Sequence, residues 1–370
     1  MTRPLSLLLD LIRLGAALLV FFHHAAIRKF ASGLPYRFTQ TGQEPVIVFF
    51  LLSGFVIAYC ADAKDRSPKI YALNRLSRLY SVVVPALLLT ALLNPLGSWL
   101  APDLYQDHWT DPATLANVGR PLFEQMLATG MFLNEIWGWD IWPGVNSPFW
   151  SLGYEAFYYL LYALVVWGGR YRWYWAGLVA AIAGPKILLL LPLWGLGVAT
   201  YKLVAASRVQ RGSGYLLVGT ALVGYILFLA TGVKSAIDQA IAVSLGADTT
   251  RWLSNSSEFL STYVTGILFA ALLVGLAAIA EDFAGPLYRF QRPIRFLAGL
   301  TFALYLFHYP LVYFLRAVVL ATHLEGLSSV IVTGGTLAAV VLLGQVTEAQ
   351  KDNWRQFLAR LVTRTRPAEE

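Results

Sequence analysis

Three ionisable side chains fall on one face of the first apolar segment, residues 5–27. Asp10 and Arg13 are three residues apart, and His24 follows Arg13 by eleven residues. At 3.6 residues per turn, this spacing aligns them on one helix face, with Arg13 and His24 about 16 Å apart along the axis. A charge inside a membrane helix costs roughly 3 kcal/mol or more and by default indicates function. The alternative is an Asp10–Arg13 pair that only anchors the helix, with His24 at an interface.

Glu155 is a second candidate, because its carboxylate stands near the start of another apolar stretch that opens at Trp150. It lies too deep for an ordinary surface charge, and the expected topology puts it at a depth comparable to that of His24. A histidine oriented by a carboxylate is a general-base pair. The sequence does not decide whether the two side chains meet, and an interfacial glutamate satisfied by loops is the alternative. His23 points about 100° away from His24 and is expected to be structural.

Arg75 and Arg78 stand one turn apart where the third apolar segment begins. Two guanidinium groups on one face suit a phosphate-rich ligand, because each can bind bidentately. The alternative is a topology signal with snorkelling side chains.

His308 lies about halfway through the apolar segment 296–320, where Pro310 frees a backbone carbonyl. It either lines the same cavity as His24 or is a satisfied core histidine. No metal site is expected, because the histidines are scattered and no metal-binding or phosphate-loop motif occurs. Cys60, the single cysteine, is expected to be a packed thiol, with an acyl-carrying nucleophile as the alternative.

Composition identifies lipid as the solvent of this chain. Of its 370 residues 57% are hydrophobic and 13% are charged, whereas soluble domains average about 25% charged. The net charge of +7 does not indicate nucleic-acid binding, because the basic residues form short clusters between apolar runs, as in cytoplasmic loops of membrane proteins.

The predicted fold is all-α and polytopic, with about ten transmembrane helices of about 20 residues each. The segments are 5–27, 44–62, 79–101, 149–169, 172–184, 186–204, 214–232, 259–280, 296–320 and 326–347. Lysine and arginine clusters follow every second segment, which places both termini in the cytoplasm; the outer loop 28–43 is a basic exception. We expect one transmembrane domain, 1–350, and a cytoplasmic basic tail, 351–370, with the loop 102–148 outside.

Five motifs resemble those of the acyltransferase-3 family of bacterial membrane O-acyltransferases, in the same order and spacing. They are Leu9-Asp10-Leu-Ile-Arg13 with His24, Phe49-Phe50-Leu-Leu-Ser53-Gly54-Phe55, Arg75-Leu-Ser-Arg78-Leu-Tyr80, Trp150-Ser151-Leu152 with Glu155 and the following Tyr158-Tyr159, and Tyr305-Leu-Phe-His308-Tyr-Pro310. The chain departs from the family at Leu11, where glycine is usual, and at Ala156 and Phe157, where an acidic and an amide residue are usual.

The resemblance implies transfer of an acyl group, commonly acetyl, from cytoplasmic acyl-CoA to a hydroxyl of a cell-envelope glycan, such as a polysaccharide or lipopolysaccharide, or of a lipid-linked sugar. The expected location is the inner (plasma) membrane. Acetyl-CoA is the expected donor, without a metal, and membrane lipid surrounds the protein. Some family members carry an additional esterase-like domain, so whether a separate extracytoplasmic protein completes acyl delivery stays open.

Each candidate residue has an expected role in that reaction. Arg75 and Arg78 would hold the CoA phosphates, and Arg13 would polarise the thioester arm. His24 would deprotonate the acceptor hydroxyl or relay the acyl group, oriented by Glu155. The remaining residues would line the substrate cavity; they are Asp10, Ser53, Trp150, Ser151, Tyr305 and His308.

Two other functions fit parts of the pattern. A proton-coupled transporter of a sugar or anionic substrate could use His24, Glu155 and His308, and inverted repeats would favour it, but the sequence shows no such symmetry. A purely structural membrane subunit would not explain why Asp10, Arg13 and His24 share one face of the first segment.

Overall fold

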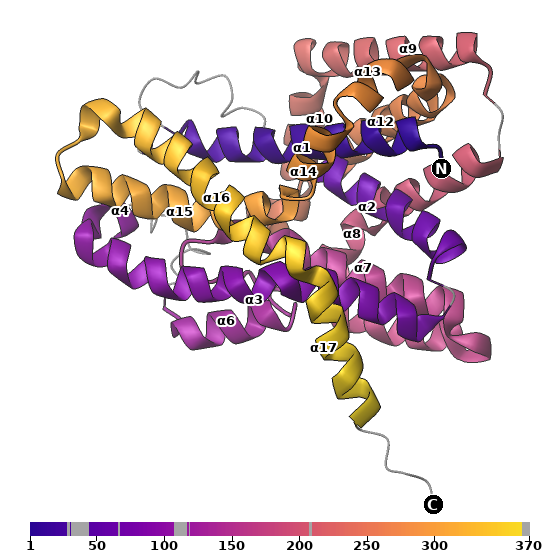
Figure 1. Cartoon of the computed structure of the whole chain (residues 1–370). Coiled ribbons are helices and arrows are strands. Elements are labelled where there is room, and N and C mark those ends of the chain that lie inside the picture. The colour runs from indigo at the N-terminus through magenta and orange to yellow at the C-terminus, as the bar shows by residue number, and fades with distance from the viewer. Residues whose placement is uncertain are drawn as a thin grey trace, which may run out of the picture.

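The computed structural model describes residues 1–27, 30, 44–65, 67–106, 117, 119–206 and 209–364. Within these ranges the regular structure is helical and contains no strand. Nine of the described helical segments are long and apolar enough to cross a membrane. The predicted all-α polytopic membrane fold is confirmed (Figure 1).

Each candidate span contains one of the helices that frame the bundle. They are α1 (Arg3–Ala25), α2 (Glu44–Ala63), α3 (Pro68–Leu100), α7 (Trp150–Trp167), α8 (Arg172–Ala206), α9 (Arg211–Ala230), α12 (Phe259–Ile279), α15 (Thr301–Ala321) and α16 (Gly335–Val346). The other α-helices are α4 (Pro102–Gln106), α6 (Leu122–Gly130), α10 (Val233–Leu245), α11 (Ala247–Leu253), α13 (Ala284–Arg289), α14 (Gln291–Ala298) and α17 (Lys351–Arg364).

A kink in α8 accounts for nine candidate spans where about ten were predicted. The segments expected at 172–184 and 186–204 are two helical stretches that meet within α8 at a kink at Gly184, whose φ is 80° and ψ is 170°, and they count as one span. Glycine tolerates this backbone conformation, and the following proline has no N–H to continue the hydrogen-bond ladder. The backbone N–H of Trp137 donates to the carbonyl of Ala183 at 3.2 Å, so a loop satisfies a polar group at the kink.

Two glycines allow α2 and α8 to cross with their backbones in contact. A Cβ at Gly54 would lie 2.1 Å from the carbonyl oxygen of Trp194, and one at Gly197 would lie 2.1 Å from that of Leu51. No larger residue fits without moving a helix. The close crossing carries Trp194 to the neighbouring Ser53, where the indole N–H donates to the hydroxyl at 3.2 Å.

The loop between α3 and α7 is held by a buried ion pair that the sequence analysis did not predict. Lys186 Nζ lies 2.6 Å from a carboxylate oxygen of Glu135, and both side chains are buried. Lys186 also donates to the carbonyl of Trp139 at 2.8 Å and lies 3.7 Å from Asp140. These contacts join the loop to α8 just past its kink.

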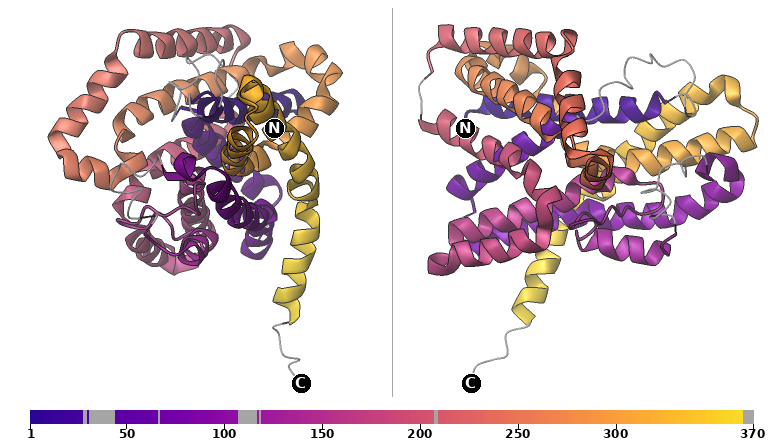
Figure 2. Two further views of the ribbon diagram at one scale, coloured as in Figure 1. Left: turned by 90° about the vertical axis from the view of Figure 1, so that its left-hand side faces the viewer. Right: turned by 180° about the vertical axis from the view of Figure 1, so that it is seen from behind.

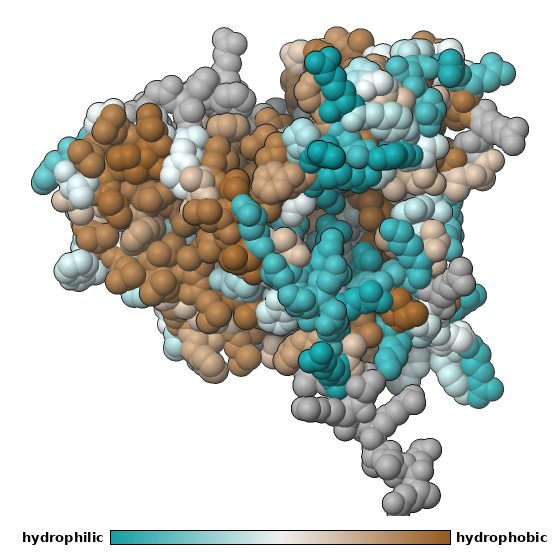
Figure 3. Space-filling view, in the orientation of Figure 1, coloured by the Kyte–Doolittle hydropathy of each residue, from teal (hydrophilic) through white to brown (hydrophobic). Residues whose placement is uncertain are grey.

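Apolar and polar surfaces occupy different parts of the molecule. In Figure 3 hydrophobic residues gather over α3, α15 and α16, and hydrophilic residues gather near the start of α1 and over α14. Large apolar side chains on α3 and α16 are exposed, among them Leu88, Leu92, Trp99, Leu342 and Val346. Such a surface is stable against lipid and not against water.

The predicted basic tail begins as a helix. α17 packs against α3, and in Figures 1 and 2 its C-terminal part projects from the bundle. The basic exception at 28–43, apart from Phe30, lies outside the described residues.

Candidate active site

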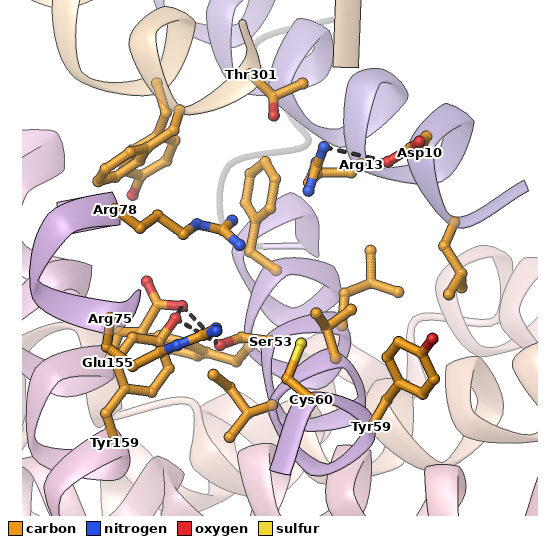
Figure 4. Close-up of a pocket in the computed structure, with 18 of the residues that line it drawn as sticks. Asp10, Arg13, Ser53, Tyr59, Cys60, Arg75, Arg78, Glu155, Tyr159 and Thr301 are labelled. Carbon is orange, nitrogen blue, oxygen red and sulfur yellow. Dashed lines mark hydrogen bonds and ion pairs between the residues drawn. The ribbon is translucent and has the colours of Figure 1, made fainter. Parts of the chain in front are cut away.

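A cavity of about 220 Å³ lies between α1, α2, α3, α7 and α15 (Figure 4). Eight predicted site residues line it: Asp10, Arg13, Ser53, Arg75, Arg78, Ser151, Glu155 and Tyr305. Residues from five helices, separated by almost 300 positions in the chain, therefore surround one space. Trp150 is not among the lining residues; its ring packs against Phe50 and Tyr154, with centroids 6.1 and 5.2 Å away.

The arginines of the cavity differ in how they are held. Arg13 donates to Asp10 at 3.2 Å and to the carbonyl of Ala298 at 2.8 Å. Arg75 donates at 3.3 Å to Asp65, whose carboxylate is buried. Arg78 reaches into the cavity in Figure 4, and no hydrogen bond or ion pair to its guanidinium is present among the described residues. Of the predicted pair, Arg78 is thus the one that can bind an anion without losing a partner.

Glu155 is bonded to Ser53 and not to His24. The Ser53 hydroxyl donates to Glu155 Oε1 at 2.6 Å, and the Tyr159 hydroxyl donates to the same oxygen. The expected orientation of His24 by Glu155 is therefore corrected. The Glu155 side of α7 faces α2 and the cavity.

His24 instead contacts His308. Its Nδ1 lies 2.9 Å from His308 Nε2, and Nδ1 of the fully buried His308 lies 2.9 Å from the carbonyl of Leu304. A carbonyl only accepts, so His308 Nδ1 carries the hydrogen, and Nε2 of the neutral ring accepts one from His24. This order leaves Nε2 of His24 with a lone pair, which is the atom a general base needs.

Tyr305 separates the histidine pair from the cavity. Its ring lines the cavity and lies 6.5 Å from that of His308, centroid to centroid. Its hydroxyl is hydrogen-bonded to Ser151 at 2.8 Å, and Phe49 packs against its ring at 5.6 Å. His308 was expected either to line the cavity or to be a satisfied core histidine. It is buried and does not line the cavity, but its ring lies near that of Tyr305, which does.

Several contributors were missed by the sequence analysis. Tyr159 was part of the motif around Trp150 but received no role, although it stands four residues after Glu155 on the same helix face. Glu348 accepts a hydrogen bond from the backbone N–H of Ala303 at 2.9 Å, near the start of α15. Nothing in the sequence connects Glu348 with that helix, nor Trp194 with the motif around Ser53.

Fold and site together define a multi-pass helical membrane protein with an arginine-lined cavity beside a histidine pair. The chain belongs to a family of acyltransferases: a family model described as an acyltransferase domain matches residues 7–345. The resemblance seen in the five motifs is thereby confirmed.

Two curated relatives are similar to part of the chain. Acyltransferase MdmB of Streptomyces mycarofaciens is 30% identical over 196 residues, which cover 46% of this chain and 43% of that protein. The O-acetyl transferase of Shigella phage Sf6 is 25% identical over 158 residues, which cover 42% of this chain and 45% of that protein. The chain thus spans less than half the length of these relatives in each match. No solved structure matches the chain.

Proposed function

We propose that this protein is a membrane O-acyltransferase that moves an acyl group, in the first place acetyl, from cytoplasmic acyl-CoA to a hydroxyl of a cell-envelope glycan or lipid-linked sugar. The family and the names of the two relatives support acyl transfer to oxygen. The observation that carries the proposal is the Arg78 guanidinium in a cavity that also contains a hydroxyl–carboxylate pair. The proposed location is the inner (plasma) membrane.

The cavity supplies groups that fit the donor. Arg78 offers hydrogen bonds to a CoA phosphate, and Lys64, which also lines the cavity, adds a second cation. Arg75 adds positive charge to the cavity wall but is a weaker candidate for direct phosphate binding, because it is already paired with Asp65. Arg13 stands across the cavity from Arg78 (Figure 4) and can polarise the thioester carbonyl.

The histidine pair supplies the base for the acceptor. Nε2 of His24 takes the proton of the acceptor hydroxyl as that oxygen attacks the acyl carbon. The Nδ1–H of the resulting cation remains hydrogen-bonded to His308, which is itself held by Leu304. His308 keeps the base in one tautomer and one orientation through the reaction.

The test is binding and transfer by the full-length protein in lipid nanodiscs. Radiolabelled acetyl-CoA should bind, and Arg78→Ala should weaken that binding roughly ten- to a hundredfold, the worth of hydrogen bonds to a charged group. Arg289→Ala is the matched control, because Arg289 is exposed and outside the cavity. With isolated envelope glycan added, label should appear in the glycan. Unchanged binding by the Arg78 variant, or no label in any glycan or lipid-linked sugar fraction, would sink the proposal.

A further inference from the structure

We propose that Ser53 is the first acceptor of the acyl group and carries it as an ester before the final transfer. This inference rests on the proposed function and adds to it a covalent step at a residue that the motif alone places only in the cavity.

Ser53 has the contacts of an activated nucleophile. Its hydroxyl donates to Glu155 Oε1 at 2.6 Å, and the indole N–H of Trp194 donates to its oxygen at 3.2 Å. The hydroxyl hydrogen therefore points at the carboxylate, and a lone pair remains for attack. Tyr159 holds the same carboxylate oxygen. Covalent catalysis uses this arrangement, in which a nucleophile is hydrogen-bonded to a base and a third group orients that base.

Ser53 lies where a thioester bound in the cavity can reach it, as does Cys60, but Ser53 also has a carboxylate to take its proton. Ser53 and Glu155 line the cavity together with Arg78, whereas His24 and His308 do not. Figure 4 shows the Arg78 guanidinium reaching into the space beside the Ser53–Glu155 pair. A donor held by Arg78 thus presents its acyl group to Ser53 while Tyr305 still separates it from the histidines.

The two steps balance. In the first, the Ser53 oxygen bonds to the acyl carbon and the C–S bond breaks; the hydroxyl proton passes to Glu155 and then to the sulfur, which leaves as the CoA thiol. In the second, the acceptor oxygen bonds to the acyl carbon and the bond to the Ser53 oxygen breaks. His24 Nε2 takes the acceptor proton, and that proton is passed on to the Ser53 oxygen as the ester bond breaks, so that both His24 and Ser53 return to their starting states. For the second step Tyr305 must leave Ser151, since it lies between the ester and the histidine pair.

A purely structural role for Ser53 would be to satisfy the carboxylate of Glu155 inside the bundle. The two roles differ in one observable, the covalent acyl-enzyme. A His24→Ala variant should accumulate that species, because it blocks the second step and leaves the cavity intact. The full-length variant in nanodiscs is incubated with radiolabelled acetyl-CoA without acceptor, denatured, and analysed by peptide mass spectrometry.

We expect about one label per chain on the peptide that contains Ser53, resistant to neutral hydroxylamine as an oxygen ester should be. Adding Ser53→Ala should lower the label about tenfold or more, whereas Ser53→Thr, which keeps a hydroxyl, should retain part of it. Ser261→Ala is the matched control, because Ser261 is a buried serine of α12 outside the cavity.

Label on Cys60, or on His24 when that residue is present, would overturn the Ser53 step, and so would an unlabelled His24→Ala variant that still binds acetyl-CoA. Transfer to glycan by the unsubstituted protein, measured in parallel, separates the outcomes. Transfer without a Ser53 ester leaves the proposed function standing and removes the relay. If the unsubstituted protein neither binds acetyl-CoA nor transfers the acyl group, both the proposed function and the Ser53 step fail.

Discussion

His24 on α1 and His308 on α15 face each other with 2.9 Å between Nδ1 and Nε2. The residues are 284 positions apart in the chain, and the carbonyl of Leu304 sets the direction of the hydrogen bonds between them. A neutral ring thus orients the candidate base where a carboxylate was expected. It supplies geometry and a hydrogen bond but no negative charge.

Replacing His308 tests this orientation. His308→Leu removes the acceptor for His24 Nδ1 and should lower kcat about a hundredfold or more, while KM for acetyl-CoA changes little because the cavity is intact. His308→Gln, whose side-chain oxygen can replace Nε2 as acceptor, should recover part of kcat. Steady-state kinetics across pH is the measurement. A Leu variant with unchanged kcat, or a Gln variant no better than Leu, would contradict the role.

Arg75 and Arg78 should fail in different ways. Arg78→Ala should weaken donor binding with little change in thermal stability, because it breaks no hydrogen bond or ion pair among the described residues. Arg75→Ala should destabilise the protein by about 3 kcal/mol, because the buried Asp65 carboxylate loses its cation. Thermal unfolding in detergent and acetyl-CoA binding separate the two effects. Asp65→Asn, added to Arg75→Ala, should restore part of the stability, and identical behaviour of the two arginine variants would refute the distinction.

The buried Glu135–Lys186 pair predicts a pH-dependent stability. Burial raises the pKa of Glu135 well above its ordinary value, and the nearby Lys186 ammonium opposes that rise. In the unfolded chain Glu135 ionises at about pH 4.3, so between the two pKa values the folded state binds more protons. The contribution of Glu135 to the free energy of unfolding is therefore complete below about pH 4.3 and is lost as the pH rises through the folded-state pKa.

Lys186→Met should steepen this loss, because nothing then compensates the buried carboxylate. We expect its destabilisation to be larger at about pH 8 than at about pH 5, reaching about 3 kcal/mol. The Lys186→Met, Glu135→Gln double variant has no carboxylate to ionise at that position and is the control. Melting curves of equal pH dependence for the single and double variants would show that Glu135 does not titrate in this range.

The crossing of α2 and α8 predicts a sharp difference between two glycines of α8. Gly197→Ala would place a Cβ 2.1 Å from the Leu51 carbonyl, so the helices must separate, at a cost of about 1–3 kcal/mol. Because Trp194 is on α8 and Ser53 is on α2, their hydrogen bond should weaken as the helices separate, and transfer activity should fall. Gly195→Ala meets nothing within 4 Å and should leave melting temperature and activity unchanged. Two variants with the same behaviour would show that the close approach does not position Ser53.

The residues themselves determined the kind of protein and most of its cavity. Apolar length identified the membrane helices, and ionisable residues at helical spacing identified Arg13 and His24. These features are local, because they depend on helix length and on the cost of a charge in lipid.

Only the tertiary structure decided which side chains meet. Glu155 and His24 were expected at similar depth, yet one bonds Ser53 and the other bonds His308. Arg75 and Arg78 share a motif, yet of the two only Arg75 forms an ion pair among the described residues. The rotation of a helix about its axis, and the choice of its neighbours, depend on contacts such as the Gly54–Gly197 crossing. Those contacts join positions far apart in the chain, so spacing within one helix carries no information about them.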